Sequence, residues 1–297
     1  MKKLHLVYFL CLCLFTVNGQ NNNDIIIGKI DSINSKILNE QRKIWIHFPE
    51  DNSNGIFEKK KYPVVYLLDG ATHFYSVVGM IQQLSPTICP KMIVVGIPNT
   101  NRTRDLTPTK VKPEPPMVNK TRADNSGGGE NFMSFIEQEL IPYIDSNYPT
   151  DSYRMFIGHS FGGLTVMNTL IEKPNLFNSY VAIDPSMWWD NKKLLNKIKQ
   201  TPLDKKYSNK TLYLGIANTM SKYMDTLSVQ KDTTIATRHI RAILELNTHL
   251  NNDSQKKISF KGKYYEEDDH GSVPLISEYD AFRFIFDFYR FKMEPQD

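Results

Sequence analysis

The sequence predicts an α/β fold built on a mostly parallel central sheet. Five short apolar runs are bounded by Gly, Pro or Asp, which is typical of strands buried on both faces. They are residues 64–68, 93–97, 155–157, 180–183 and 212–216. Apolar residues recur at helical spacing within 132–144, 233–250 and 279–291. Strands that alternate with helices imply βαβ crossovers, with helices on both faces of the sheet.

The remaining segments complete this sheet. Residues 25–30 and 43–48 are strand-like and precede the parallel strands, so we expect an antiparallel N-terminal meander. Residues 258–265 form a last strand. Residues 98–130 are rich in Asn, Thr, Arg and Pro and predict a long loop. Because this loop follows the strand at 93–97, it emerges at the carboxyl edge of the sheet, where α/β proteins hold their sites.

Composition favours a single globular domain over residues 20–297. Of the 297 residues, 40% are hydrophobic and 23% are charged, which suits a sizeable core and excludes global disorder. The net charge of +4 is scattered among acidic residues without a basic stripe, so nucleic acid is not a predicted partner. The sequence does not predict an oligomeric state.

The start of the chain has the layout of a secretory signal peptide, residues 1–19. Lys2 and Lys3 form a positive region, residues 4–17 are almost wholly apolar, and Gly19 provides a small residue at the cleavage site. We therefore expect an exported protein, periplasmic or secreted, with no stable membrane insertion after cleavage. An uncleaved anchor is the alternative. Of the three cysteines only Cys89 remains after cleavage, so no internal disulfide is expected.

Residues 158–163, Gly-His-Ser-Phe-Gly-Gly, match the G-x-S-x-G pattern of a nucleophile elbow. A strand precedes the motif and an apolar helical segment follows it, so the chain must turn sharply at Ser160. Glycines two residues before and after the serine keep side chains out of that turn. The pattern predicts Ser160 as the nucleophile of an α/β hydrolase and the N–H of Phe161 as an oxyanion donor.

A serine hydroxyl needs a general base, and in this fold the chain order is Ser, acid, His. Three histidines follow Ser160. His239 and His249 fall in the predicted helix 233–250, and we interpret them as structural or surface groups. His270 lies in a loop between the last strand and the last helix. His270 is therefore the predicted base.

The acid is expected after the strand at 212–216, but Asn218 stands at the usual turn. The next carboxylates are Asp225 and Asp232. We favour Asp232, although it also suits a helix N-cap, and Asp225 is the alternative. A third possibility is that no acid takes part, so that a Ser–His pair is oriented by a neutral group such as Asn218.

Other residues are candidates for the oxyanion hole and for substrate binding. The N–H of Ala71 or Gly70, in the turn after the strand at 64–68, is the expected second oxyanion donor. His73 precedes the nucleophile in the chain and is expected only to line the pocket. Arg102 and Arg104 either pair with an anionic or phenolic substrate or pin the long loop through a neighbouring aspartate.

Four segments carry a family resemblance. They are residues 65–70 (VYLLDG), 96–108 (GIPNTNRTRDLTP), 158–163 (GHSFGG) and 269–274 (DHGSVP). With them the chain resembles the "putative esterase" (esterase D-like) family of α/β hydrolases, in the branch that contains bacterial siderophore esterases. The resemblance implies hydrolysis of carboxylic esters without a cofactor or metal, with Ser160 as nucleophile and His270 as base.

The resemblance also bears on Asn218 and on the segment 184–189. Asn218 stands where many relatives have Asp, so the acid does not carry over. The segment 184–189, Asp-Pro-Ser-Met-Trp-Trp, resembles the pocket wall of the branch, which makes Trp188 a predicted substrate contact.

The predicted function is hydrolysis of a small-molecule carboxylic ester through an acyl-serine intermediate, outside the cytoplasm. Siderophore, phenolic and acyl-sugar esters all fit. The alternatives are an acyltransferase of the same fold, in which an alcohol replaces water, and a binding protein with weakened catalysis.

Overall fold

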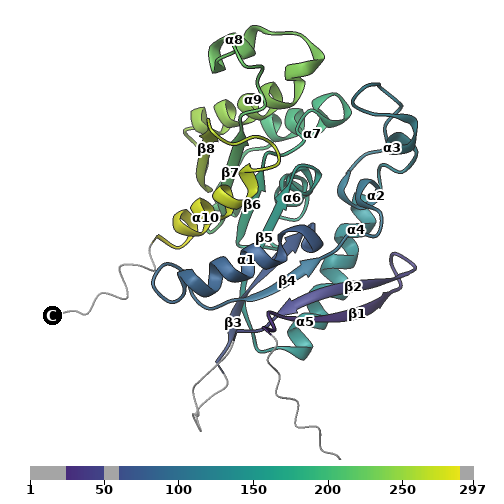
Figure 1. Cartoon of the computed structure of the whole chain (residues 1–297), viewed down its shortest axis with the longest axis vertical. Coiled ribbons are helices and arrows are strands. Elements are labelled where there is room, and N and C mark those ends of the chain that lie inside the picture. Colours follow the sequence, from purple (N-terminus) through teal and green to yellow (C-terminus); the bar gives the residue numbers. More distant parts are fainter. Residues whose placement is uncertain (1–24, 50–59, 288–297) are drawn as a thin grey trace, which may run out of the picture.

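An eight-stranded sheet runs through the centre of the protein in the order β1-β2-β4-β3-β5-β6-β7-β8 (Figure 1). The computed structural model describes residues 25–49 and 60–287, and the predicted signal peptide lies outside them. The strands are β1 (Lys29–Ser35), β2 (Glu40–His47), β3 (Tyr62–Leu68), β4 (Ile93–Ile97), β5 (Thr150–His159), β6 (Ser179–Ile183), β7 (Thr211–Ala217) and β8 (Ser259–Tyr265). The β1–β2 and β2–β4 pairs are antiparallel and the other pairs are parallel. The predicted α/β-hydrolase fold with an antiparallel N-terminal meander is confirmed.

Helices cover both faces of this sheet (Figure 1). They are α1 (Gly70–Leu84), α2 (Arg102–Leu106), α3 (Lys120–Asp124), α4 (Gly129–Phe135), α5 (Ile141–Asn147), α6 (Phe161–Glu172), α7 (Trp189–Gln200), α8 (Thr226–Lys231), α9 (Arg238–Asn252) and α10 (Val273–Ile285). A π-helical turn η1 (Ile136–Leu140) joins α4 to α5, and η2 (Lys205–Tyr207) and η3 (Ile235–Thr237) are short 3₁₀ turns. Residues of α1 and α10 form the core on one face, and residues of α4, α5, α6, α7 and α9 form the core on the other.

The central and outer strands differ in the way the sequence pattern predicts. β4 and β6 are buried along their whole length, because helices cover both of their faces. β1 and β8 lie at the two edges and alternate between exposed and partly buried residues. Charged and polar side chains on such edges discourage pairing with other chains.

Several predicted boundaries were wrong. A strand was predicted at residues 25–30, but β1 begins at Lys29. Lys29 pairs with Ile46, and β2 ends at the next residue, so β2 does not extend far enough to pair with residues 25–27. The predicted loop at 98–130 contains α2, α3 and the start of α4. α10 begins at Val273 instead of near residue 279, with a proline in its first turn, where the missing N–H costs nothing.

No helix within residues 25–49 and 60–287 combines the length and the apolar character needed to cross a bilayer.

Candidate active site

Ser160 occupies a strained turn between β5 and α6. Its backbone has φ 59° and ψ −114°, a conformation that residues with a Cβ rarely adopt. A Cβ on Gly158 would lie 2.4 Å from the carbonyl of Gly162, so the turn can close only with glycine at that position. The Ser160 N–H donates to the carbonyl of Ile183, which ties the elbow to the end of β6. The structure therefore has the elbow that the motif predicts.

His270 lies beside Ser160 in the loop between β8 and α10. Its Nε2 is 3.1 Å from Ser160 Oγ, within hydrogen-bond distance. The loop is fixed by Asp269, whose carboxylate accepts from the N–H groups of Gly271 and Ser272. The structure thus brings together the two residues that the sequence paired as nucleophile and base.

Asp184 is the carboxylate at the other side of the His270 ring. Its Oδ2 lies 2.5 Å from His270 Nδ1. The register of the sheet explains this placement: His159 pairs with Ile183 across β5 and β6, so Ser160 and Asp184 are the first residues past paired positions. Asp184 is fully buried and adopts φ 40°. Its Oδ1 accepts from the N–H of Ala217 at 3.1 Å.

A second histidine also binds Asp184. His239 Nε2, at the start of α9, lies 2.8 Å from the same Oδ2. Burial by itself raises the pKa of the Asp184 carboxyl, but the hydrogen bonds and charge of His239 and His270 outweigh it and hold that pKa below its usual range. The carboxylate is therefore charged at neutral pH. Of the sequence-based interpretation of His239 as a structural or surface group, the structure excludes the surface location, because the ring binds Asp184 and is only 15% exposed.

Neither predicted acid reaches His270. Asp225 caps α8, accepting from the N–H groups of Leu227 and Ser228. Asp232 accepts from the hydroxyls of Thr234 and Thr237, ahead of α9. Both are local turn and cap interactions, which short carboxylates make readily. The prediction of Asp232, or alternatively Asp225, as the partner of the base is corrected to Asp184.

Asn218 does not orient the base either. Its side-chain amide donates to the carbonyl of Glu266, and its backbone N–H donates to the carbonyl of Asp268. These bonds hold the turn after β7 against the loop that carries His270. A signal for Asp184 was present in the sequence, because it directly follows the apolar run 180–183 and precedes a proline. Asp184 follows the C-terminal end of the central strand β6, which lies at the same edge of the sheet as Ser160.

A buried group of polar side chains lies behind His270. The ring of His159 packs on that of His270 with centroids 4.4 Å apart. Burial is the main cause that lowers the pKa of His159 to about 3, so this ring stays neutral against the base. His73 follows, with its ring centroid 6.0 Å from that of His159 and its Nδ1 3.6 Å from Glu278 Oε1. Burial favours the neutral form of both His73 and Glu278, so they are neighbours and not an ion pair.

The predicted oxyanion donors lie at two adjacent helix starts. Phe161 is the first residue of α6, and Gly70 and Ala71 begin α1. Backbone N–H groups in the first turn of a helix have no intrahelical acceptor and carry partial positive charge. The Asp69 carboxylate, at the start of α1, lies 3.3 Å from the place of a Cβ on Gly162, so the two helix starts are neighbours. The assignment of these donors stays a prediction.

A cleft of about 340 Å³ opens over Ser160. Residues of six segments line it: Arg102, Met117, Arg122, Ser160, Phe161, Ser186, Trp188, Thr219, Ala236, His239 and His270. The guanidinium groups of Arg102 and Arg122 lie 5.5 and 5.7 Å from the centroid of the Phe161 ring. The cleft therefore combines aromatic surface with two positive charges. Arg122 was not among the residues that the sequence singled out.

The predicted substrate contacts divide into two groups. Trp188 and Arg102 line the cleft, and Arg102 also forms a two-point ion pair with the carboxylate of Asp69. Arg104 does not line it, because its guanidinium is bound by Glu40 and Asp105. His73 is not a lining residue of this cleft and lies in the buried group behind His270. The predictions of Arg104 and His73 as pocket residues are therefore corrected.

Asp184, His239 and His270 are also the one group within the described ranges that offers three candidate metal ligands close together. Ligands of a tetrahedral Zn²⁺ at about 2.1 Å are roughly 3.3 Å apart. The N–O distances here are 2.5 and 2.8 Å, which are hydrogen-bond lengths. The three side chains are arranged for proton sharing.

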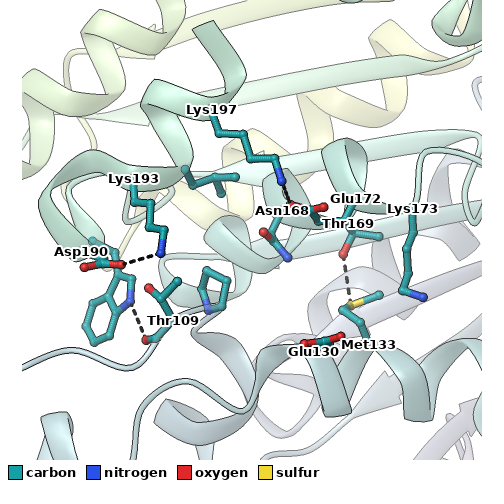
Figure 2. Close-up of a pocket in the computed structure, with 13 residues that line it drawn as sticks. Thr109, Glu130, Met133, Asn168, Thr169, Glu172, Lys173, Asp190, Lys193 and Lys197 are labelled. Atoms are coloured by element: carbon teal, nitrogen blue, oxygen red, sulfur yellow. Dashed lines mark hydrogen bonds and ion pairs between the residues drawn. The ribbon is translucent and has the colours of Figure 1, made fainter. Parts of the chain in front are cut away.

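A larger cavity, of about 450 Å³, lies between α4, α6, α7 and residues 108–109, which follow α2 (Figure 2). Trp189 separates it from the cleft: its ring contacts Phe161, and its indole N–H donates to the carbonyl of Thr109. Acidic and basic side chains from Glu130, Lys193 and others line it. Its lining includes no serine or histidine, whereas Ser160 and His270 both line the smaller cleft.

Comparisons with known proteins agree with this geometry. The family model described as "Putative esterase" matches residues 35–259. A crystal structure of an IroE-like serine hydrolase from Shewanella oneidensis is 34% identical and has a TM-score of 0.76, with 88% of this chain and 80% of that chain covered.

Curated relatives match over shorter stretches. The ferri-bacillibactin esterase BesA of Bacillus subtilis is 34% identical over 149 residues, 46% of this chain and 52% of that protein. A siderophore enterobactin esterase of Emericella nidulans is 28% identical over 165 residues, 50% of this chain and 54% of that protein. The chain spans about half the length of these relatives.

Proposed function

Because the chain belongs to the family described as "Putative esterase", we propose that it is a serine hydrolase that cleaves carboxylic esters of siderophores. One observation carries this proposal: Ser160 Oγ, the His270 ring and the Asp184 carboxylate form a continuous line of hydrogen bonds of 3.1 and 2.5 Å. That arrangement is the one that activates a serine hydroxyl as a nucleophile.

The first half of the proposed reaction forms an acyl-enzyme. His270 Nε2 takes the proton of Ser160 as Oγ attacks the ester carbonyl carbon. The charge of Asp184 stabilises the imidazolium that results, and its hydrogen bond to Nδ1 keeps Nε2 free to accept. N–H groups of Phe161 and Ala71 hold the oxyanion. His270 then protonates the departing alcohol, and the C–O bond of the ester breaks.

The second half releases the acid by the same route. Water gives a proton to His270 and attacks the acyl carbon, and the proton returns to Ser160 as its bond to the acyl group breaks. If an added alcohol takes the place of water, the enzyme acts as an acyltransferase. Product analysis with and without added alcohol distinguishes the two outcomes.

Two observations support siderophore esters as the substrate class. The curated relatives carry names of siderophore esterases. The cleft places Arg102 and Arg122 over the ring of Phe161, and Trp188 also lines it, which suits an acyl group that is aromatic or bears anionic oxygens.

The decisive experiment is a panel of siderophore, phenolic, acyl-sugar and short acyl esters, tested on the purified protein and on Ser160→Ala. We expect hydrolysis of siderophore esters, and a loss of about 10⁵-fold in kcat in the variant, because the nucleophile is gone. Ser152→Ala, at an exposed position of β5, is the matched control and should behave as wild type. Absence of hydrolysis of every ester by the wild type would refute the proposal.

The contribution of the cleft charges has its own test. Arg122→Gln should raise KM about tenfold for anionic esters and leave KM for neutral esters unchanged, because one charged hydrogen bond is lost. Lys120→Gln, on the same helix but outside the cleft lining, is the control. Equal effects on neutral and anionic esters would contradict a role for this charge.

We also propose that the protein is exported, on the basis of the charged and apolar pattern of residues 1–19. Protein recovered from the periplasm or the medium should begin after Gly19. A cytoplasmic product that retains Met1 would contradict export.

A further inference from the structure

The carboxylate that faces the base has more than one histidine partner. Asp184 Oδ2 lies 2.5 Å from His270 Nδ1 and 2.8 Å from His239 Nε2. The two rings stand at 90° to each other with centroids 5.1 Å apart. A carboxylate only accepts hydrogen bonds, so each histidine donates an N–H to the same oxygen.

The hydrogen bonds of Asp184 show why the second partner matters. Its side chain has no exposed surface, so its bonds must come from the protein. The Ala217 N–H binds Oδ1 at the longer distance of 3.1 Å, and His239 and His270 bind Oδ2. Among the described residues, the carboxylate without His239 would keep one long backbone bond and the bond to the base that it must orient.

His239 is itself held rigidly. It is the second residue of α9, and that helix packs on the sheet through fully buried side chains at Ile240 and Ile243. The His239 side chain is only 15% exposed. A donor mounted on a packed helix keeps its direction better than one on a loop.

We propose that His239 is a positioning residue of this site: it fixes the Asp184 carboxylate so that the carboxylate holds His270 in line with Ser160. This inference rests on the proposed function, because it assumes that Ser160 is the nucleophile. His239 acts through Asp184 and transfers no proton to the substrate. Its direct effect is on the geometry and charge of the carboxylate.

The charge on Asp184 depends on the same contact. The His239 hydrogen bond is the largest of the interactions that offset the cost of burying this carboxylate. Removing the donor leaves a buried oxygen with one fewer bond, which raises the pKa of the carboxyl and weakens its support of the imidazolium.

The test uses substitutions that separate the donor from the ring. His239→Leu and His239→Phe remove the N–H, and Phe keeps the ring volume. His239→Gln keeps an N–H at a similar reach. His249→Leu, near the end of the same helix, is the matched control, because His249 lies outside the cleft lining. All variants are compared with wild type and with Ser160→Ala.

Three readouts are measured on each folded variant: kcat and KM for an ester that wild type hydrolyses, the rate of Ser160 labelling by a fluorophosphonate, and the downfield proton resonance of the His270 Nδ1–H. We expect His239→Leu and His239→Phe to lower kcat and the labelling rate about 10- to 100-fold with KM unchanged. The downfield resonance should shift or broaden. His239→Gln should recover most of the lost rate, which a merely structural loss would not.

The outcomes distinguish this inference from the proposed function. If wild type is not labelled and hydrolyses no ester, the proposed function fails. If wild type is active but His239→Phe matches His249→Leu in kcat and labelling rate, the positioning role is refuted and the function stands. The positioning role is also refuted if His239→Gln is as slow as His239→Phe. If His239→Leu does not fold, the comparison of Phe with Gln decides alone.

Discussion

Two buried carboxylates lie near the histidines of the site, and they are in opposite protonation states. Asp184, after β6, accepts three hydrogen bonds, and its pKa is held below its usual range. Glu278, on α10, is 1% exposed, and within the described ranges its Oε2 has no hydrogen-bond partner. Burial raises the pKa of Glu278 to about 8. The number of donors, and not burial itself, decides which carboxylate is charged.

This difference in protonation gives the two carboxylates different places in the site. The charge on Asp184 faces His270, where an imidazolium forms in the proposed reaction. Glu278 keeps its proton beside His73, because burial favours the neutral form of both side chains. Two carboxyl groups therefore have different charges, which are set by the groups that surround them.

Removing the charge from the first carboxylate has the largest expected effect. Asp184→Asn should lower kcat about 10⁴-fold with KM nearly unchanged, because an amide in that place no longer stabilises the imidazolium and presents a donor to Nδ1. Steady-state kinetics on the best ester measures this. A loss of tenfold or less would mean that the Ser–His pair works without the acid.

Removing the second carboxylate should change stability and its pH dependence instead. Glu278 is protonated in the folded protein up to about pH 8, whereas in the unfolded chain it ionises near pH 4.5. Wild type therefore loses stability as pH rises between these values, on the order of 5 kcal/mol. Glu278→Gln should lack that loss, so its stability relative to wild type rises with pH.

Urea unfolding at pH 5, 7 and 8.5 measures this difference. The kcat of Glu278→Gln near neutral pH should stay within about twofold of wild type, because both side chains are neutral there. A difference in unfolding free energy that stays constant with pH would show that Glu278 is already ionised in the folded protein.

A carboxylate at position 218 should not replace Asp184. In the Asp184→Asn background, Asn218→Asp puts a carboxylate at the turn after β7, where its oxygen would face the carbonyl of Glu266 that the amide now binds. We expect no recovery of kcat and a loss of about 1 kcal/mol in stability from the broken bond. Recovery of kcat by tenfold or more would show that the β7 turn can supply the acid.

The smallest effects are expected from the carboxylates of the α8 region. Asp225→Ala and Asp232→Ala should leave kcat and KM within about twofold of wild type, because their partners are local N–H and hydroxyl groups. A small fall in melting temperature is expected from the lost cap at Asp225. A large drop in kcat in either variant would reopen the assignment of the acid.

Much of the fold was predictable because its signals are local. The apolar runs at 93–97 and 180–183 became β4 and β6, since a strand buried on both faces must be apolar throughout. The helices inside 98–130 were not predicted, because each is only a few residues long and packs through side chains of distant segments. Arg42 shows this: it lies on β2 and bonds to Asp105 of α2 at 2.6 Å.

The site divides in the same way. Ser160 and His270 were found from the elbow motif, the order of residues along the chain and a loop position, all of which are properties of short segments. Asp184, His239 and Arg122 were missed, because each is defined by a neighbour far away in the sequence.

The sequence by itself thus pointed to Ser160, to His270 as its partner and to the sheet that holds them. The conformation of an elbow is imposed by its own glycines, and central strands by their own apolar side chains. Only the tertiary structure decided the acid and its second histidine. The pairing of β5 with β6 brings Ser160 and Asp184 to the same edge, and the packing of α9 brings His239 to the same oxygen. Such a contact depends on the register between elements, which no single segment encodes.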